Sequence, residues 1–136
     1  VQDGMGITMI RKAGLKTGII TGRVSEVVRK RAEELNFDEI CQGFFWKEKA
    51  LENILEKYQL AEDEIAYVGD DILDLPVLQR VGLPIAVQNA RPEVSSKCYY
   101  TSDASGGHGA IREIVDWLLD LRNERQVIID YYTNSG

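Results

Sequence analysis

Short apolar runs alternate with segments of helical periodicity along almost the whole chain, and this alternation restricts the fold more than any other feature. Strand-like runs occur at 15–21, 38–43, 64–70, 83–87 and 98–101, and helical patterns at 4–13, 25–35, 47–58, 72–80, 90–97 and about 109–122. Strands separated by single helices require right-handed crossovers, which place them in a mostly parallel sheet with helices on both faces. We therefore expect an α/β fold, Rossmann-like, with three α/β/α layers.

The expected domain boundaries follow from the same pattern. We assign residues 1–122 to one domain and residues 123–136 to a C-terminal tail, which the pattern leaves open between a strand and a docked extension. Gly14 is placed to end the first helix, because glycine accepts the left-handed conformation that follows a helix. Ser25 is placed to cap the second.

The composition is that of an ordinary globular chain. Of the 136 residues, 44% are hydrophobic and 28% are charged, values typical of a domain with a packed core. The formal net charge of −6 offers no basic stripe for nucleic acid, and no apolar run approaches the ~20 residues that span a bilayer. Cys41 and Cys98 form no C-x-x-C motif. We expect buried free thiols in a reducing cytoplasm, and neither nucleic acid nor membrane as a partner.

The stretch GDDILD places three carboxylates, those of Asp70, Asp71 and Asp74, directly after an apolar run. In parallel sheets, ligands bind beyond the carboxyl ends of the strands, and like charges crowded there repel one another unless a cation lies among them. Oxygen ligands suit Mg²⁺, which commonly takes one or two protein carboxylates and leaves its other positions to water and substrate phosphate. The alternative is that one aspartate only caps the following helix.

Two more polar groups follow other expected strands. In IITGR, Thr21 precedes a glycine turn and a helix N-terminus, where a hydroxyl and free backbone N–H groups converge on an anion. Lys47 opens the next helix after a strand and a glycine turn, so we expect its ammonium over the same pocket, with Lys49 as the alternative. An ordinary turn and a solvated surface lysine are the competing interpretations.

Hydroxyl, lysine and acidic cluster, in that order at successive strand ends, resemble motifs II, III and IV of the haloacid dehalogenase superfamily. The segments DGMGI, AGLKTGIITGR, YVGDDILDLPVLQRVGLPIAV, ARPEV and GGHGAIREI further resemble the 3-deoxy-D-manno-octulosonate 8-phosphate (Kdo8P) phosphatases. This resemblance covers residues 1 to about 120. The intervals between Thr21, Lys47 and Asp70 leave no room for an inserted cap domain, which fits the capless branch to which those phosphatases belong.

The resemblance implies a Mg²⁺-dependent phosphatase that hydrolyses Kdo8P to Kdo and phosphate in lipopolysaccharide precursor synthesis. Phosphoryl transfer requires mainly positioning and charge neutralisation. By resemblance, Thr21 and the N–H of Gly22 hold phosphate oxygens, and Lys47 bridges phosphate and nucleophile. Asp70 is implied to bind the metal.

Four further residues receive roles from the same resemblance. Asp71 and Asp74 are implied to orient metal-bound water and Lys47; we group Asp71 with the metal and Asp74 with catalysis, and which of the two matters more stays open. Arg23 and Arg31 match positions where the octulosonate phosphatases present arginines to the sugar acid, whose carboxylate suits a guanidinium. Relatives that act on nine-carbon sugar-acid phosphates tend to have an acidic residue at the Arg23 position. An ordinary helix-surface arginine is the alternative for Arg31.

One family element is absent. The first motif, D-x-D-G, supplies the nucleophilic aspartate and the general acid and base in relatives, on a strand that precedes the segment corresponding to VQDGMGI. Asp3 is not a substitute, because its neighbours match a different family segment. Covalent catalysis through an aspartyl phosphate needs that carboxylate. We therefore expect an upstream D-x-D-G segment, and we expect a chain that begins at Val1 to be inactive.

Two segments depart from the family. GGHG, with His108, stands where the family usually has GGRG; in relatives this region approaches a neighbouring subunit's active site. His108 therefore either contacts substrate across an interface or faces solvent. The aromatic run FFW at 44–46 either lines the pocket or forms an oligomer contact, which is the favoured interpretation. The family's ring-shaped homotetramer is implied by the resemblance alone.

Three other functions stay open. One is a non-catalytic oligomerisation module, as in the phosphatase-like domain attached to some sialic-acid-activating synthetases. The missing first motif favours it, and the retention of Thr21, Lys47 and GDD-x-x-D disfavours it. The second is a phosphatase for a nine-carbon, sialic-acid type of sugar-acid phosphate. The third is a phosphoacceptor receiver domain, which is disfavoured because Lys47 precedes the acidic cluster instead of following it.

Overall fold

The structure of the protein is a computed structural model that describes residues 2–134. In this range the element order is α1 (Gln2–Lys12), β1 (Gly18–Ile20), α2 (Glu26–Glu34), β2 (Glu39–Cys41), α3 (Lys47–Tyr58), η1 (Glu62–Glu64), β3 (Ala66–Gly69), η2 (Ile72–Asp74), α4 (Leu75–Leu78), β4 (Leu83–Ala86), α5 (Pro92–Ser95), β5 (Tyr100–Thr101), α6 (Ala110–Leu121) and α7 (Arg125–Asn134). Every strand pair in this part of the chain is parallel. The predicted α/β class is therefore confirmed.

The local signals explain most of the helix boundaries. Ser25 caps α2 by accepting a hydrogen bond from the backbone N–H of Val28 at 3.2 Å, and Gly14, with φ of +95°, follows the end of α1. The predicted helix at 90–97 is shorter and begins at Pro92, which suits a first helical turn because it has no N–H to leave unpaired. The predicted helix at 72–80 divides into the 3₁₀ turn η2 and α4. Between residues 2 and 134, no helix is both long enough and apolar enough to cross a membrane.

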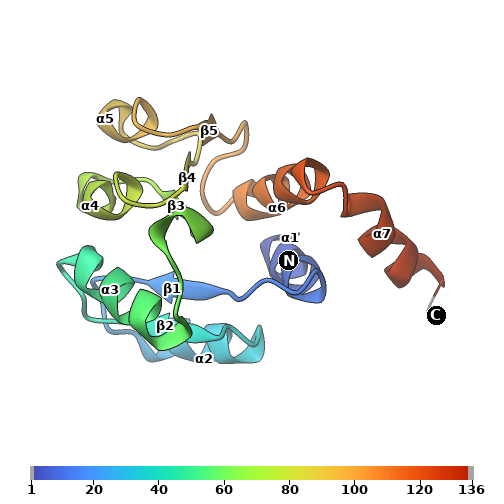
Figure 1. Cartoon of the computed structure of the whole chain (residues 1–136), viewed down its shortest axis with the longest axis horizontal. Coiled ribbons are helices and arrows are strands. Elements are labelled where there is room, and N and C mark those ends of the chain that lie inside the picture. Colours follow the sequence, from blue (N-terminus) through green and yellow to red (C-terminus); the bar gives the residue numbers. More distant parts are fainter. Residues whose placement is uncertain (1, 135–136) are drawn as a thin grey trace.

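The helices form a layer on each side of the strands (Figure 1). On one side, Leu51 of α3 packs against Val77 of α4, while Val94 of α5 packs against Ala86 of β4. On the other, Ile114 of α6 packs against β4, and α1 and α6 form the most extensive contact between two helices. These layers are the expected three-layer α/β/α arrangement.

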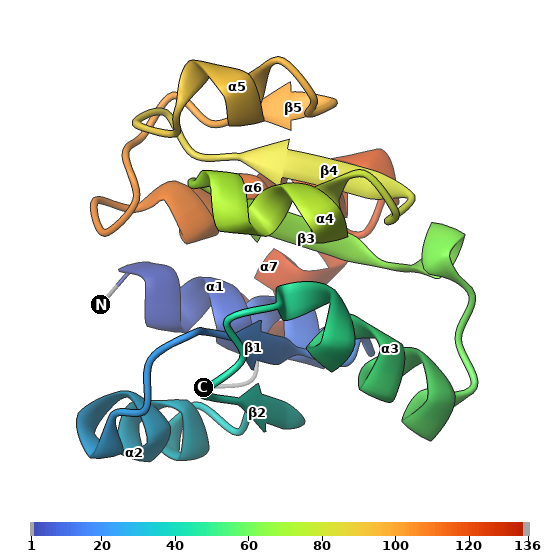
Figure 2. The same cartoon turned by 90° about the vertical axis from the view of Figure 1, so that its left-hand side faces the viewer.

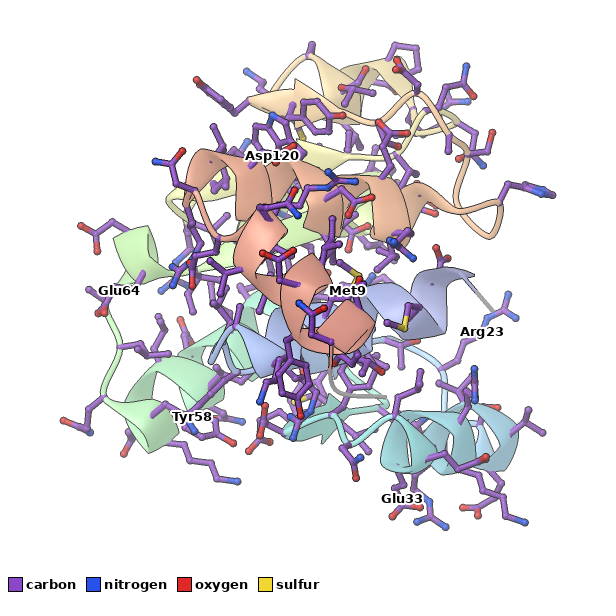
Figure 3. All side chains as sticks on the ribbon, turned by 90° about the vertical axis from the view of Figure 1, so that its right-hand side faces the viewer. Met9, Arg23, Glu33, Tyr58, Glu64 and Asp120 are labelled. Carbon is purple, nitrogen blue, oxygen red and sulfur yellow. The ribbon has the colours of Figure 1, made fainter. Side chains whose placement is uncertain are left out.

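The C-terminal segment is a helix that docks on α1 and α6, so the strand alternative for this tail is wrong. Figure 3 shows Met9 beside α7, and Met9, with an exposed fraction of only 2%, shares an apolar cluster with Val115, Leu119 and Ile128. Ile128 is the buried residue of α7. The assignment of a separate tail beginning at residue 123 stays a prediction.

The two cysteines are free, as predicted, but they are half-buried rather than buried. Burial raises the pKa of both thiols; the charge of Glu39 adds to this at Cys41, and that of Asp74 at Cys98. Low thiolate content makes both side chains weak nucleophiles.

The sheet is divided into two parts, which sequence reasoning did not anticipate. β1 pairs only with β2, and β3 pairs with β4, which pairs with β5. Figure 2 shows the strands in the order β5, β4, β3, β1, β2 from top to bottom, with β3 and β1 pointing the same way and no strand between them in residues 2–134. Helices join the two parts on both sides of the strands: α1, which leads into β1, packs on α6, and α3, which follows β2, packs on α4. The facing edges of β1 and β3 therefore lack strand partners.

Candidate active site

A cavity of about 230 Å³ opens where β1 and β3 face each other. Its walls are apolar on the strands, and its polar groups come from the end of β3, the start of α3 and the turn η2. The lining residues are Ile20, Lys47, Tyr67, Val68, Gly69, Asp70, Asp74, Val87 and Gly106. The carboxyl ends of parallel strands are where α/β proteins bind ligands.

Asp74 is the best-satisfied polar side chain of the cavity. Its Oδ1 accepts hydrogen bonds from Lys47 Nζ at 2.7 Å and from the Tyr67 hydroxyl at 2.6 Å. Its Oδ2 accepts from the backbone N–H groups of Asp70 at 3.0 Å and Asp71 at 3.2 Å. Because a carboxylate has about four acceptor positions, these donors leave Asp74 little capacity to bind a metal.

The charge state of Asp74 follows from these contacts. Burial raises the pKa of the Asp74 carboxyl, since only 2% of the residue is exposed. The hydrogen bonds from Lys47, Tyr67 and the Asp70 backbone outweigh burial, and the pKa lies below its usual value. Asp74 is therefore the buried anion that holds the Lys47 ammonium.

The sequence GDDILD folds into this arrangement for local reasons. Asp71 caps η2, because its Oδ1 accepts a hydrogen bond from the backbone N–H of Ile72 at 2.7 Å. The single turn of η2 then returns Asp74 to the backbone of Asp70 and Asp71. Gly69 makes room for it, since a Cβ at this position would lie 2.7 Å from the Cβ of Asp74.

Asp70 is the carboxylate that faces the cavity without a cationic partner at bonding distance. Asp70 as a whole residue is exposed, but partial burial of its carboxyl, followed by the negative charge of Asp74, raises the pKa of that carboxyl. A cation beside Asp70 would relieve this cost, so the donor set fits an Mg²⁺ site of the sparse kind, with one or two protein carboxylates. Among residues 2–134, no group of three or more His, Cys, Asp or Glu side chains is placed to hold a metal ion. Further ligands would have to come from elsewhere.

Lys47, rather than Lys49, is the lysine that the structure brings into the cavity. The Lys47 side chain is 16% exposed and pairs with Asp74. The Lys49 side chain is 66% exposed, and its Nζ lies 3.9 Å from Glu52 Oε1 on the outer face of α3. The metal assignment of Asp71 stays a prediction, because Asp71 is not part of the cavity lining and its Oδ1 caps η2.

Apart from Lys47, the predicted phosphate and substrate residues lie outside the cavity lining; they are Thr21, Gly22, Arg23 and Arg31. Thr21 directly follows Ile20, which does line it, and Thr21 Oγ1 accepts a hydrogen bond from the backbone N–H of Arg23 at 3.2 Å. Gly22, Arg23 and Arg31 are exposed. Figure 3 shows Arg23 at the periphery of the molecule. These assignments stay predictions.

Sequence reasoning missed two parts of the site. Tyr67 was not singled out, although a tyrosine in a buried strand usually needs a partner for its hydroxyl. The loop 102–109 was also missed as an organised element: its Gly106 lines the cavity and donates from its backbone N–H to Asn89 Oδ1 at 2.9 Å. Glu113 of α6 accepts hydrogen bonds from the backbone N–H groups of Asp103 and Ala104.

The remaining sequence candidates lie away from the cavity lining. His108 is exposed on the loop 102–109. Phe45 and Trp46 are 56% and 61% exposed and stack edge to face with ring centroids 4.9 Å apart. Asp3 accepts a hydrogen bond from the backbone N–H of Arg112 at 3.3 Å, at the start of α6. That Asp3 does not replace the missing nucleophile stays a prediction.

Known proteins with similar sequences are hydrolases of one family. Residues 38–114 match the family described as haloacid dehalogenase-like hydrolase. The 3-deoxy-D-manno-octulosonate 8-phosphate phosphatase of Escherichia coli K12 is 40% identical over 119 residues, which cover 88% of this chain and 63% of the relative. The Yersinia pestis enzyme of the same name is 37% identical. The chain thus spans less than two thirds of the length of these curated relatives.

Solved structures agree with the sequence matches. A probable YrbI family phosphatase from Pseudomonas syringae pv. phaseolica 1448a superposes with a TM-score of 0.94 at 37% identity, covering 97% of this chain and 75% of that one. The 3-deoxy-D-manno-octulosonate 8-phosphate phosphatase from Moraxella catarrhalis, solved with magnesium, phosphate and Kdo, gives a TM-score of 0.93 at 34% identity, with coverages of 96% and 75%.

Proposed function

The chain belongs to the haloacid dehalogenase-like hydrolases and, within them, to the Kdo8P phosphatase family, and we propose that its cavity is part of the active site of a Mg²⁺-dependent sugar-acid phosphatase. The proposed reaction is hydrolysis of Kdo8P to Kdo and phosphate, in lipopolysaccharide precursor synthesis. The observation that carries it is the convergence of Lys47, Asp74 and Asp70 on one cavity.

The residues of this cavity suit a phosphoryl group. One proton of the Lys47 ammonium is donated to Asp74, and the other two are free to meet phosphate oxygens in the cavity. Thr21 and the N–H of Gly22, at the end of β1, would hold further oxygens. Bound beside Asp70, Mg²⁺ would supply positive charge to the phosphate oxygens.

The nucleophile of this reaction is not among the residues described. We place it on a strand that precedes α1 and lies between β1 and β3, because both strands are unpaired on their facing edges. A parallel strand in that position would end level with Ile20 and Gly69, next to the cavity. A D-x-D-G segment there would bring its first aspartate toward Lys47 and Asp70, and would supply metal ligands in addition to Asp70 that residues 2–134 do not provide.

This placement is tested by comparing the protein that carries the proposed upstream D-x-D-G segment, called here the full-length protein, with the chain 1–136. We expect turnover of Kdo8P by the full-length protein and none by the chain alone. An intact mass that matches residues 1–136 alone, together with full turnover, would contradict the placement. Loss of turnover in the full-length protein when the first aspartate of D-x-D-G is replaced by asparagine would support it.

The substrate assignment depends on Arg23 and Arg31. Both side chains are exposed, so a sugar acid would have to extend from the cavity across the surface to meet Arg23. Arg23→Glu should raise the KM for Kdo8P, because it removes a partner of the substrate carboxylate. Equal kcat/KM for Kdo8P and for a nine-carbon sugar-acid phosphate would instead support the alternative substrate.

We also propose a homotetramer in the cytoplasm. Exposed apolar side chains at the start of α2 and before α3 support an oligomer contact; they are Val24, Val27, Phe45 and Trp46. The free thiols fit a reducing compartment. Sedimentation of the full-length protein should give a tetramer, and a monomer would remove this part of the proposal. A stable tetramer without any phosphatase activity would favour the non-catalytic module.

A further inference from the structure

Among residues 2–134, Tyr67 is the one aromatic residue that lines the cavity. Its ring lies on β3 between two apolar clusters, one around Leu51 and Val77 and the other around Leu78 and Val94. This packing fixes the ring, and the hydroxyl at its tip donates to Asp74 Oδ1 at 2.6 Å. The hydroxyl is therefore held by the core rather than by solvent.

The hydroxyl shares its acceptor with Lys47. Lys47 Nζ lies 2.7 Å from the same Oδ1, while Oδ2 is held by the backbone of Asp70 and Asp71. Burial, followed by the charge of Asp74, raises the pKa of Tyr67, so the phenol stays protonated and remains a donor. Two donors on one oxygen determine where around Oδ1 the ammonium can lie.

We infer that Tyr67 is a positioning residue that aims the Lys47 ammonium into the cavity through Asp74, an inference that rests on the proposed phosphatase function. Without the hydroxyl, Oδ1 offers a second acceptor position on the side of β3. The ammonium then shifts toward this vacated position and away from the phosphate. Misplacement of a catalytic group by about 1 Å can cost up to two orders of magnitude in rate.

The direct test is Tyr67→Phe in the full-length protein, which keeps the ring and removes only the hydroxyl. We expect kcat to fall about 10- to 100-fold, with a smaller change in KM. In a Lys47→Met background the same change should leave kcat within about twofold, because the group that Tyr67 positions is already gone. Equal losses in both backgrounds would indicate a merely structural role and overturn the inference.

The chain offers a matched control in Tyr58. Its hydroxyl donates to Glu39 Oε1 at 2.7 Å, and Lys57 Nζ binds the same oxygen. Tyrosine, carboxylate and lysine thus meet here as they do in the cavity, but at the opposite end of α3 from Lys47. Figure 3 shows Tyr58 at this end. Tyr58→Phe should leave kcat unchanged. A loss equal to that of Tyr67→Phe would show that the effect is not specific to Lys47.

A second readout separates this inference from the proposed function. If the wild-type full-length protein does not hydrolyse Kdo8P, the proposed function fails, and the positioning is decided by ¹⁵N-correlated NMR of the Lys47 ammonium. We expect Tyr67→Phe to shift that signal and Tyr58→Phe to leave it in place. An ammonium signal that is identical in Tyr67→Phe and wild type would overturn the inference.

Discussion

Lys47 Nζ lies 2.7 Å from Asp74 Oδ1, and both side chains are largely removed from solvent. The pair joins the first residue of α3 to the last residue of η2, so it fixes two separate elements around one cavity. Ion pairs in such surroundings contribute little net stability, but removal of one partner leaves an uncompensated buried charge.

Asp74→Asn should therefore destabilise the full-length protein and abolish turnover. The amide keeps the shape of the carboxylate but leaves the Lys47 ammonium without a counter-charge. In one orientation of the amide, its N–H₂ group faces the backbone N–H donors of Asp70 and Asp71. In the other orientation, the N–H₂ group faces the Lys47 ammonium, so in both cases a donor meets a donor. We expect a loss of about 3 kcal/mol in the free energy of unfolding, measured by urea denaturation. Asp71→Asn is the control for the stability measurement alone, because asparagine caps helices as well as aspartate.

Lys47→Met and Lys49→Met should differ sharply in activity. Lys47 is the lysine that reaches the cavity, whereas Lys49 lies on the exposed face of α3 beside Glu52. Loss of one charged donor from the transition state costs about 100-fold or more in kcat, so we expect this for Lys47→Met. Lys49→Met should match wild type. Comparable losses in the two variants would contradict the assignment of Lys47.

Gly69→Ala should damage the site through sterics alone. The new Cβ would lie 2.7 Å from the Cβ of Asp74, which would push Asp74 away from Lys47. We expect a loss of about 1–3 kcal/mol in the free energy of unfolding, together with reduced kcat. Gly18→Ala on β1 is the matched control, because its Cβ would lie 3.4 Å from the Cβ of Glu39, an ordinary van der Waals contact. A Gly69→Ala protein as stable and active as Gly18→Ala would show that η2 adjusts freely.

Glu113 holds the loop 102–109 by accepting hydrogen bonds from its backbone, and its contribution to the free energy of unfolding should depend on pH. Burial raises the pKa of the Glu113 carboxyl, but hydrogen bonds from Tyr100 and from the backbone of Asp103 and Ala104 outweigh it, and the pKa lies below its usual 4.5. The contribution of Glu113 is therefore fully present above pH 4.5 and is lost as pH falls through the lower, folded-state value.

Glu113→Gln provides the comparison for this pH dependence. At pH 7 the wild type should be more stable than Glu113→Gln by about 1 kcal/mol in the free energy of unfolding. The difference should shrink on acidification below pH 4.5, when the wild-type carboxyl also becomes neutral. A difference that stays constant from pH 7 to pH 3 would show that the charge of Glu113 has no part in holding the loop.

Local sequence patterns were sufficient to predict the fold class and most elements. The bounds of α3 agree with the predicted 47–58, because Leu51 and its neighbours repeat at helical spacing, and Ser25 caps α2 as predicted. The tail was less clear: α7 buries Ile128 against α1 and α6, and its helical state depends on this contact between distant parts of the chain.

The residues of the site that directly follow a strand, or begin the next helix, were predictable from the sequence. Lys47, Asp70 and Asp74 meet in one cavity because α3 begins, and β3 ends, at the same edge of the sheet. The contact between Tyr67 and Asp74 was not predictable from spacing, since it depends on how the side chain of Asp74 turns back across η2. The division of the sheet between β1 and β3 was likewise hidden, because strand order is a property of long-range pairing.

The most direct test of the central claim is phosphate release from Kdo8P by the full-length protein, measured across a Mg²⁺ titration in wild type and in Asp70→Asn. We predict turnover that requires Mg²⁺ in wild type and falls about 100-fold or more in Asp70→Asn, since Asp70 is the cavity carboxylate free to take the metal. Turnover that is independent of Mg²⁺, or that is the same in Asp70→Asn and wild type, would contradict the account.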